Sequence, residues 1–174
     1  GILHLAIELY PRLEIYHPQE VVYKDINESI FLSTQFNNNG DYTPLDKIPE
    51  YFINAILLME DQRFYSHHGI DYKGIIRSIF TNIKEGEIKQ GGSTLTQQLA
   101  RSLYLTNEKT LSRKIKEALI AKKLESQFSK DQILELYLNT IYFGHNIYGI
   151  NQASYYYFNK LPPELTLAES SLLA

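Results

Sequence analysis

"INAILLMEDQRFYSHHG", residues 53–69, places a glutamate and an aspartate directly after a run of five apolar residues. The positions that would share the core-facing stripe of a helix are Ile53, Ile56, Leu57, Glu60 and Phe64. Glu60 therefore stands where the pattern asks for an apolar residue. At the edge of apolar packing, loss of water raises the pKa of a carboxyl group toward the range that suits proton transfer. The alternative is that the helix ends near Glu60 and its carboxylate simply faces solvent.

The composition limits the classes of protein that this chain can belong to. Its 174 residues suffice for one domain with a core, and 44% apolar and 21% charged residues are ordinary for a globular protein. A net charge of −3 gives no basic surface for nucleic acid. The absence of cysteine excludes disulfides and thiolate zinc sites. No stretch approaches the roughly 20 apolar residues of a membrane span.

Helix signals dominate the chain from Pro49 onward. Residues 1–45 are irregular or short-stranded by composition, with β-branched and aromatic residues in "EVVYKD" and "SIFLST". We expect helices within residues 50–64, 72–86, 91–105, 111–128, 129–143 and 148–160. Three capping boxes indicate helix starts: Thr94 with Gln97, Ser129 with Gln132, and Thr166 with Glu169. The sequence therefore predicts one mostly helical domain with a small extended portion near its N-terminus.

The stretch "QGGSTLTQQLAR", residues 90–101, combines glycines, hydroxyl groups and a helix start. Gly91 and Gly92 allow a tight turn. The backbone N–H groups that open the following helix, with the hydroxyls of Ser93 and Thr96, would suit a phosphate or diphosphate. Arg101 lies on the same side of that helix as Thr94 and could reach a second phosphate. A plain capping box explains Thr94 and Gln97 without a ligand, but not Gln98 or the two glycines.

The stretch "SRKIKEALIAKKLE", residues 112–125, carries Arg113 and Glu117 at i and i+4. On a surface helix such a pair contributes only about 0.3–0.5 kcal/mol, so by itself the spacing favours a solvated charged face. His67 and His68 invite a metal-site interpretation, but adjacent histidines seldom chelate one ion together. Packing or capping before Gly69 is the simpler interpretation of either histidine.

Taken together and in this order, these motifs are similar to those of glycosyltransferase family 51, the peptidoglycan transglycosylases of class A penicillin-binding proteins and of monofunctional enzymes. The matching residues are Glu60, Asp61, Phe64, His67 and Gly69; Gly91, Ser93, Thr94, Thr96, Gln97 and Gln98; and Arg113, Lys114 and Glu117. "ILELYLN", "YFG", "YGI" and the C-terminal twenty residues continue the likeness. It covers residues 42–174. Arg101 departs from the lysine that relatives often carry, although the charge is the same.

The resemblance implies a lysozyme-like, two-lobed helical fold and a polymerase of lipid II. Glu60 would be the general base that deprotonates the acceptor sugar, so that undecaprenyl diphosphate is displaced in one inverting step. Glu117 would be the second catalytic carboxylate, organising the departing diphosphate with Arg101, Arg113 and Lys114. The remaining residues expected to bind substrate are Asp61, Phe64, His67, Ser93, Thr94, Gln97 and Gln98. Mg²⁺ or Mn²⁺ could accompany the diphosphate near Glu117, and no organic cofactor is implied.

The same resemblance implies the partners and the location. The partners would be lipid II, the growing glycan chain, the membrane surface and moenomycin-type inhibitors, with no nucleic acid. We expect the extracytoplasmic face of a bacterial membrane, an anchor upstream of Gly1, and a transglycosylase domain cut short at its C-terminus. Residues 1–41 have no assigned role. Two other functions stay open, a lysozyme-like glycan hydrolase and a non-catalytic scaffold that binds lipid II.

The segment of residues 72–85 has an apolar face beside basic residues. The apolar positions are Ile75, Ile76, Ile79, Phe80 and Ile83, and the basic ones are Lys73, Arg77 and Lys84. Such a helix could lie among lipid headgroups or pack on the core. The resemblance places this stretch in a membrane-facing lobe and favours the first alternative.

Overall fold

The computed structural model describes the backbone of residues 13–16, 20–24, 30–35, 42–85, 92–105 and 110–174, and side chains from residue 42 onward except those of residues 79, 82, 84 and 85. Near the N-terminus, β1 (Leu13–Tyr16), β2 (Glu20–Lys24) and β3 (Ile30–Gln35) form an antiparallel sheet in that order. The extended portion predicted from "EVVYKD" and "SIFLST" is therefore confirmed as β2 and β3.

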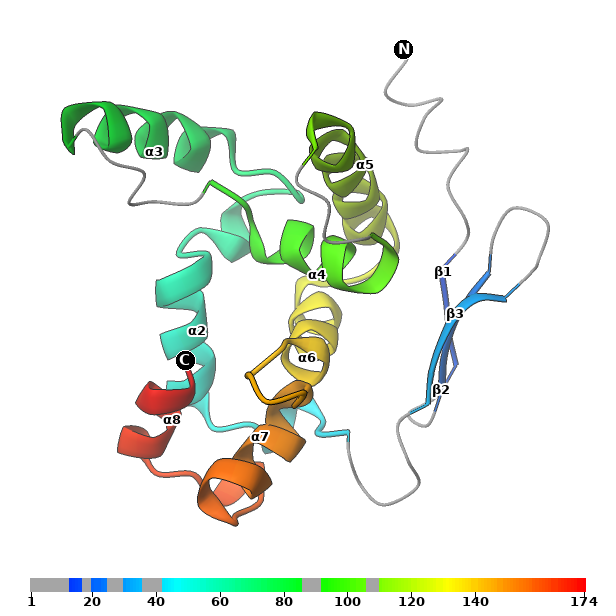
Figure 1. The fold of residues 1–174 in the computed structure, drawn as a ribbon, viewed down its shortest axis with the longest axis vertical. Coiled ribbons are helices and arrows are strands. Elements are labelled where there is room, and N and C mark those ends of the chain that lie inside the picture. The colour runs from blue at the N-terminus through cyan, green and yellow to red at the C-terminus, as the bar shows by residue number, and fades with distance from the viewer. Residues whose placement is uncertain (1–12, 17–19, 25–29, 36–41, 86–91, 106–109) are drawn as a thin grey trace.

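The rest of the described chain is helical, as predicted (Figure 1). The helices are α2 (Glu50–Glu60), α3 (Tyr72–Glu85), α4 (Leu95–Tyr104), α5 (Leu111–Gln127), α6 (Lys130–Thr140), α7 (Gly149–Phe158) and α8 (Leu167–Leu173). Short 3-10 turns lie at η1 (Leu45–Lys47), η2 (Phe64–Ser66) and η3 (Pro162–Glu164). All three predicted capping boxes are present, at the starts of α4, α6 and α8.

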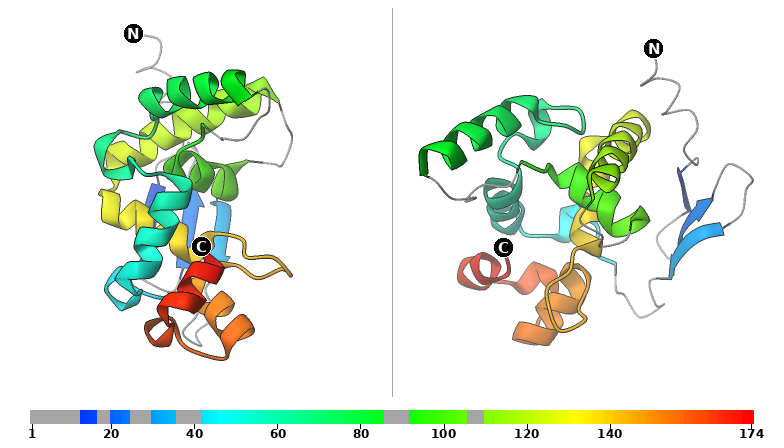
Figure 2. Two further views of the ribbon diagram at one scale, coloured as in Figure 1. Left: turned by 90° about the vertical axis from the view of Figure 1, so that its left-hand side faces the viewer. Right: turned by 45° about the horizontal axis from the view of Figure 1, so that its top comes forward.

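The core lies where α2, α4, α5 and α6 meet. Its largest fully buried side chains include Phe52, Ile56, Phe64, Leu95, Leu99, Leu124, Ile133, Leu134 and Leu138. Helix α4 packs on α5 and α6, and α2 packs beside α8. Helix α3 lies at the upper edge of the molecule, away from α7 and α8, in Figure 1 and in both views of Figure 2. Within the described residues, no helix is both long enough and apolar enough to span a membrane.

A backbone constraint lies at the junction of α6 and α7. Gly149 has a φ of +77°, and a Cβ atom there would stand 2.5 Å from the backbone oxygen of Asn139. Only glycine fits this close approach without strain. The residues between Ile141 and Gly149 fold back as a hairpin with a bridge between Tyr142 and Tyr148.

Candidate active site

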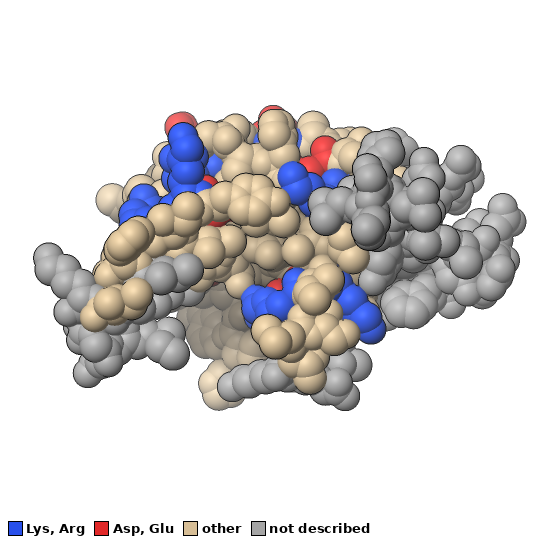
Figure 3. Space-filling model, turned by 90° about the horizontal axis from the view of Figure 1, so that it is seen from above, with Lys and Arg blue, Asp and Glu red and all other residues tan. Residues whose placement is uncertain are grey.

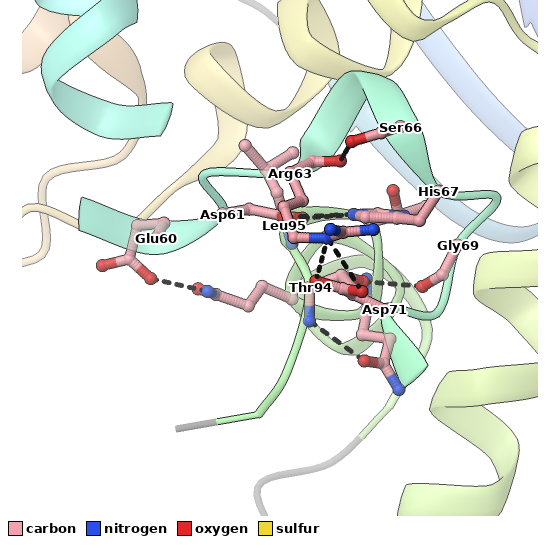
Figure 4. A network of polar contacts seen from close by, with 12 residues as sticks. Glu60, Asp61, Arg63, Ser66, His67, Gly69, Asp71, Thr94 and Leu95 are labelled. Carbon is pink, nitrogen blue, oxygen red and sulfur yellow. Dashed lines mark hydrogen bonds and ion pairs between the residues drawn. The ribbon is translucent and has the colours of Figure 1, made fainter. Parts of the chain in front are cut away.

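Asp61 joins the end of α2 to the start of α4 (Figure 4). The Nε2 atom of His67 lies 3.0 and 2.9 Å from its two carboxylate oxygens, and the backbone N–H of Leu95 donates to Oδ2 at 3.0 Å. Asp61 and His67 are both buried. The carboxylate thus occupies the position at a helix N-terminus where negative charge is most stable.

The expectation of a phosphate site at the start of α4 is wrong, because Asp61 already occupies that position. The N–H of Leu95 is bonded to Asp61, that of Gln97 donates to the Thr94 hydroxyl at 3.1 Å, and that of Thr94 donates to the Gln97 side chain at 3.0 Å. These three donors are therefore not free for a ligand. The Thr96 hydroxyl donates to Glu125 of α5 at 2.7 Å, inside the packing. Gly91 lies outside the described residues.

Glu60 is the last residue of α2 and is exposed. The prediction that it loses water at the edge of apolar packing is therefore wrong, because the helix ends there and Phe64 belongs to the separate turn η2. Glu60 is nevertheless held in place. The amide Nε2 of Gln98 donates to its Oε2 at 2.6 Å, so α4 fixes the direction of this carboxylate.

Tyr137 of α6 contacts the side chain of Gln98. Its hydroxyl lies 3.4 Å from Gln98 Oε1, and burial, with the nearby Glu60 carboxylate, raises the pKa of the Tyr137 phenol. The phenol therefore keeps its proton and can donate. Sequence reasoning did not single out Tyr137 as part of the site. The sequence feature that could have indicated this role is a hydroxyl group on an otherwise apolar helix face.

Glu117 is the most buried carboxylate of the site, with 1% of its surface exposed. Arg113 Nη1 contacts its Oε1, and Lys114 Nζ lies 2.7 Å from its Oε2. The interpretation of this helix face as solvated is therefore wrong. The i, i+4 spacing could not tell a buried face from an exposed one.

Two cations, Arg113 and Lys114, contact this carboxylate, and a third, Arg101, lies near enough to Lys114 to affect its pKa. Burial, then the charges of Arg101 and Arg113, lower the pKa of Lys114. Lys114 also donates to the Ser93 hydroxyl at 2.7 Å. Arg101, Arg113 and Lys114, which we call the cationic cluster, outnumber Glu117 and leave a local excess of positive charge, which is suited to a multiply charged anion.

An open groove extends from Glu60 to Ser93, the residue whose hydroxyl accepts from Lys114. Glu60, Asp61, Ser93 and Thr94 line it. So do Arg63, Asp71 and Ser78, which sequence reasoning did not single out, and Arg77, which it assigned only to the basic side of residues 72–85. Arg63 Nε lies 3.1 Å from Asp71 Oδ2. Burial alone would raise the pKa of Asp71, but the Gly74 N–H and the Arg63 guanidinium bring it below its usual value. Arg63 lies between the motif residues Asp61 and Phe64, and Asp71 follows Gly69, but neither belongs to the motif itself.

Three residues expected to bind substrate are buried away from the groove. Phe64 is in the core, with Lys130 Nζ 4.3 Å from its ring centre; His67 holds Asp61; and Gln97 closes the capping box. In this structure they position the site and do not face a ligand. Asp61 and Thr94 line the groove, but Asp61 is bonded to Leu95, and the Thr94 hydroxyl donates to the Gly69 carbonyl at 2.6 Å.

The residues around Glu117 do not fit a divalent ion held by the protein. Both of its oxygens face cationic side chains, and the described part of the chain has no group of three His, Cys, Asp or Glu side chains that could hold a metal. A protein-held ion would have to displace these cations. An ion carried by the diphosphate itself stays a prediction, and no step proposed below uses it.

Known proteins resemble this chain closely. Residues 27–174 match the family described as Transglycosylase. The chain is 46% identical over 143 residues to penicillin-binding protein 1F of Bacillus subtilis and 53% identical over 133 residues to penicillin-binding protein 1A of Aquifex aeolicus, covering 82% and 76% of this chain. It is 48% identical over 183 residues to penicillin-binding protein 1A of Neisseria cinerea, covering 100% of this chain.

The chain belongs to the transglycosylase family. It spans 20%, 18% and 23% of those three relatives, or about a fifth of their length.

Replacing Glu117 by Gln tests whether the buried ion pairs hold the site together. Removing one partner leaves crowded, partly buried cations uncompensated, so we expect the free energy of unfolding to fall by about 3 kcal/mol. Urea denaturation would measure it. Asp46→Asn is the control, because Asp46 and Lys47 form an exposed pair at 3.7 Å whose loss should cost less than about 0.5 kcal/mol. An equally small loss of unfolding free energy in both variants would show that the ion pairs of Glu117 do not hold the site together.

Proposed function

We propose that this chain is a peptidoglycan glycosyltransferase that polymerises lipid II into glycan strands at the extracytoplasmic face of a bacterial membrane. The observation that carries the proposal is the position of Ser93. Ser93 lines one groove with Glu60 and accepts a hydrogen bond from Lys114 of the cationic cluster. A base and an anion site thus adjoin the same groove, as the displacement of a diphosphate by a sugar hydroxyl requires.

Glu60 acts on the acceptor. Its carboxylate is exposed to the groove and is oriented by Gln98, so it can take the proton from the 4-hydroxyl of the acceptor N-acetylglucosamine. The oxygen then attacks C1 of the terminal N-acetylmuramic acid of the donor, and the bond from C1 to the diphosphate oxygen breaks. The α linkage becomes β in one displacement, without a covalent enzyme intermediate.

The cationic cluster acts on the leaving group. Negative charge grows on the diphosphate as the bond to C1 breaks, and fixed positive charge at that place stabilises the transition state more than the ground state. Arg101 and Lys114 would face the diphosphate, with the Ser93 hydroxyl as a further polar contact. Glu117 holds Arg113 and Lys114 in their positions and keeps their mutual repulsion tolerable.

Glu60→Gln tests the role of the base. Glutamine has nearly the same shape and can still bond to Gln98, but it cannot accept the proton, so polymerisation of lipid II should fall about 10²–10⁴-fold with the melting temperature unchanged. The assay is a gel of labelled glycan product. Glu50→Gln, at the exposed opposite end of α2, should keep the parent rate. Turnover above a tenth of the parent rate in the Glu60 variant would remove Glu60 from this role.

Arg101→Ala tests the anion site. A charge-assisted contact to phosphate contributes about 1.5–3 kcal/mol, so affinity for undecaprenyl diphosphate or moenomycin should fall roughly 10- to 100-fold in calorimetric titration. Arg113→Ala should weaken binding too, but it also deprives buried Glu117 of a partner, which makes Arg101 the cleaner variant. Unchanged affinity in both variants would contradict an anion site here.

The pH dependence of anion binding provides a second test of this site. Burial, Arg101 and Arg113 lower the pKa of Lys114 in the free protein, and a bound anion would raise it again. Binding that prefers protonated Lys114 is therefore complete below its free pKa and weakens as the pH rises through it. Lys114→Arg should shift the alkaline loss of affinity to higher pH, because arginine stays charged.

Helix α3 supports a contact with the membrane. Its side chains Tyr72, Ile76, Phe80 and Ile83 are exposed, and Lys73 and Arg77 beside them are exposed as well. The alternative of a core-facing helix is therefore wrong for these positions; Ile79 and Lys84 lie outside the described side chains. Seen from above, Lys and Arg side chains lie in several separate patches on this face of the molecule, with Asp and Glu atoms among them (Figure 3). Apolar and basic groups together suit an interface with anionic lipids.

Ile76→Ser/Phe80→Ser tests this contact. Because both side chains are already exposed, the melting temperature should stay within a few degrees, while co-sedimentation with vesicles that contain anionic lipid should fall severalfold. The matched control is Leu167→Ser/Leu172→Ser on α8, which removes two exposed leucines far from α3 in Figure 1. Equal vesicle binding by parent and α3 variant would end the membrane proposal.

A further inference from the structure

A second surface, which the reaction above does not use, is made of aromatic rings on the hairpin of residues 141–149 and on α7. Tyr142, Tyr148, Tyr156 and Tyr157 have between 39% and 60% of their surface exposed, and His145 is exposed too. Exposed aromatic groups gathered in one place mark an interaction site more often than chance. We call these five residues the aromatic platform.

The platform is built rigidly. Within the hairpin, the Phe143 N–H donates to Ile147 O at 2.9 Å, and the Gly149 N–H donates to Ile141 O at 2.9 Å. The Tyr157 hydroxyl donates to the Phe143 carbonyl at 2.8 Å and ties α7 to the hairpin. Rings from both parts also adjoin one another: Tyr142 and Tyr148 at 5.1 Å, His145 and Tyr156 at 6.1 Å, and Tyr156 and Tyr157 at 5.0 Å between centres.

The charge of the platform differs from that of the reaction site. Residues 141–159 contain no Asp, Glu, Lys or Arg. A phosphorylated ligand or an anionic lipid surface would find no counter-charge in this segment. A neutral ligand whose apolar faces can stack on rings, and whose hydroxyl and amide groups can bond to phenols, suits it instead. Sugar rings of an N-acetylated glycan have these properties.

The platform follows directly on the helix that supports the reaction site. Tyr137 of α6 reaches Gln98 beside Glu60, and Tyr142 lies in the hairpin that begins directly after α6 ends at Thr140. Figure 2 shows the hairpin, in orange between α6 and α7, projecting from the helical body. A polymer that runs from Glu60 along α6 would meet it.

We propose that the aromatic platform binds the growing glycan strand several sugars away from the reaction centre. The proposal rests on the polymerase function proposed above and assigns it a remote subsite. Rings of Tyr142 and Tyr156 stack on the apolar faces of the neutral sugars. A strand held there stays on the enzyme between additions, so strands grow longer before release.

The test uses a ligand without peptide or diphosphate, the β-1,4-linked hexamer of N-acetylglucosamine. Tyr142→Ala/Tyr156→Ala should bind it at least about tenfold more weakly than the parent in calorimetry, because two stacking rings are lost. Tyr142→Phe/Tyr156→Phe should bind within about twofold of the parent, since stacking needs the ring and not the hydroxyl. Tyr65→Ala, an exposed tyrosine on η2, is the matched control and should bind as the parent does.

A second readout is the length of glycan made from lipid II, which should shorten in the alanine variant and not in the phenylalanine variant. If the double alanine variant fails to fold, Tyr156→Ala alone serves in both measurements. No hexamer binding by the parent, or equal binding by parent and alanine variant, would overturn the platform. So would a shift from dimer to monomer in sedimentation on the alanine change, because the surface would then join copies of the chain.

These outcomes separate the two proposals. A parent chain that binds the hexamer but makes no polymer would contradict the polymerase function. It would also contradict the role of the platform in strand growth. A parent that polymerises normally, with strand lengths unchanged in the alanine variant, would overturn the platform alone.

Discussion

The carboxylate of Asp61 is the contact on which the site depends. It ends α2, accepts from His67 of the following turn, and caps the first turn of α4 through the Leu95 N–H. Each of these bonds is buried, where an unpaired polar group costs about 1–3 kcal/mol, so the three segments are held in one arrangement. Glu60, one residue earlier, is thereby placed opposite Gln98 of α4. Its exposure to the groove follows from this junction.

The same junction explains why the proposed anion site is assigned to α5 and not to the start of α4. The helix dipole of α4 is already used by Asp61, which leaves no place for a second anion at its first turn. Positive side chains supply the attraction instead, from Arg101 at the end of α4 and from Arg113 and Lys114 at the start of α5. Glu117 lets these cations stand close together, and its burial makes the arrangement rigid.

Local sequence patterns predicted the helices and strands well, but they predicted less well which side chains are buried and what they contact. Capping boxes at Thr94, Ser129 and Thr166 gave three helix starts, because they depend on neighbouring residues only. The stripe from Ile53 to Phe64 failed beyond Glu60, because Asp61 leaves the helical conformation and its carboxylate bonds to the distant Leu95. Burial of Glu117 and the support of Gln98 by Tyr137 likewise depend on residues far apart in sequence, which spacing does not reveal.

Incubation of the parent chain with labelled lipid II in anionic vesicles tests the central claim most directly, with product length and released undecaprenyl diphosphate measured together. The account predicts a β-linked polymer and the release of one undecaprenyl diphosphate for each new glycosidic bond. A hydrolase would shorten preformed glycan without releasing diphosphate, and a scaffold would leave lipid II unchanged. Either of those results would contradict a glycosyltransferase built around Glu60 and the cationic cluster.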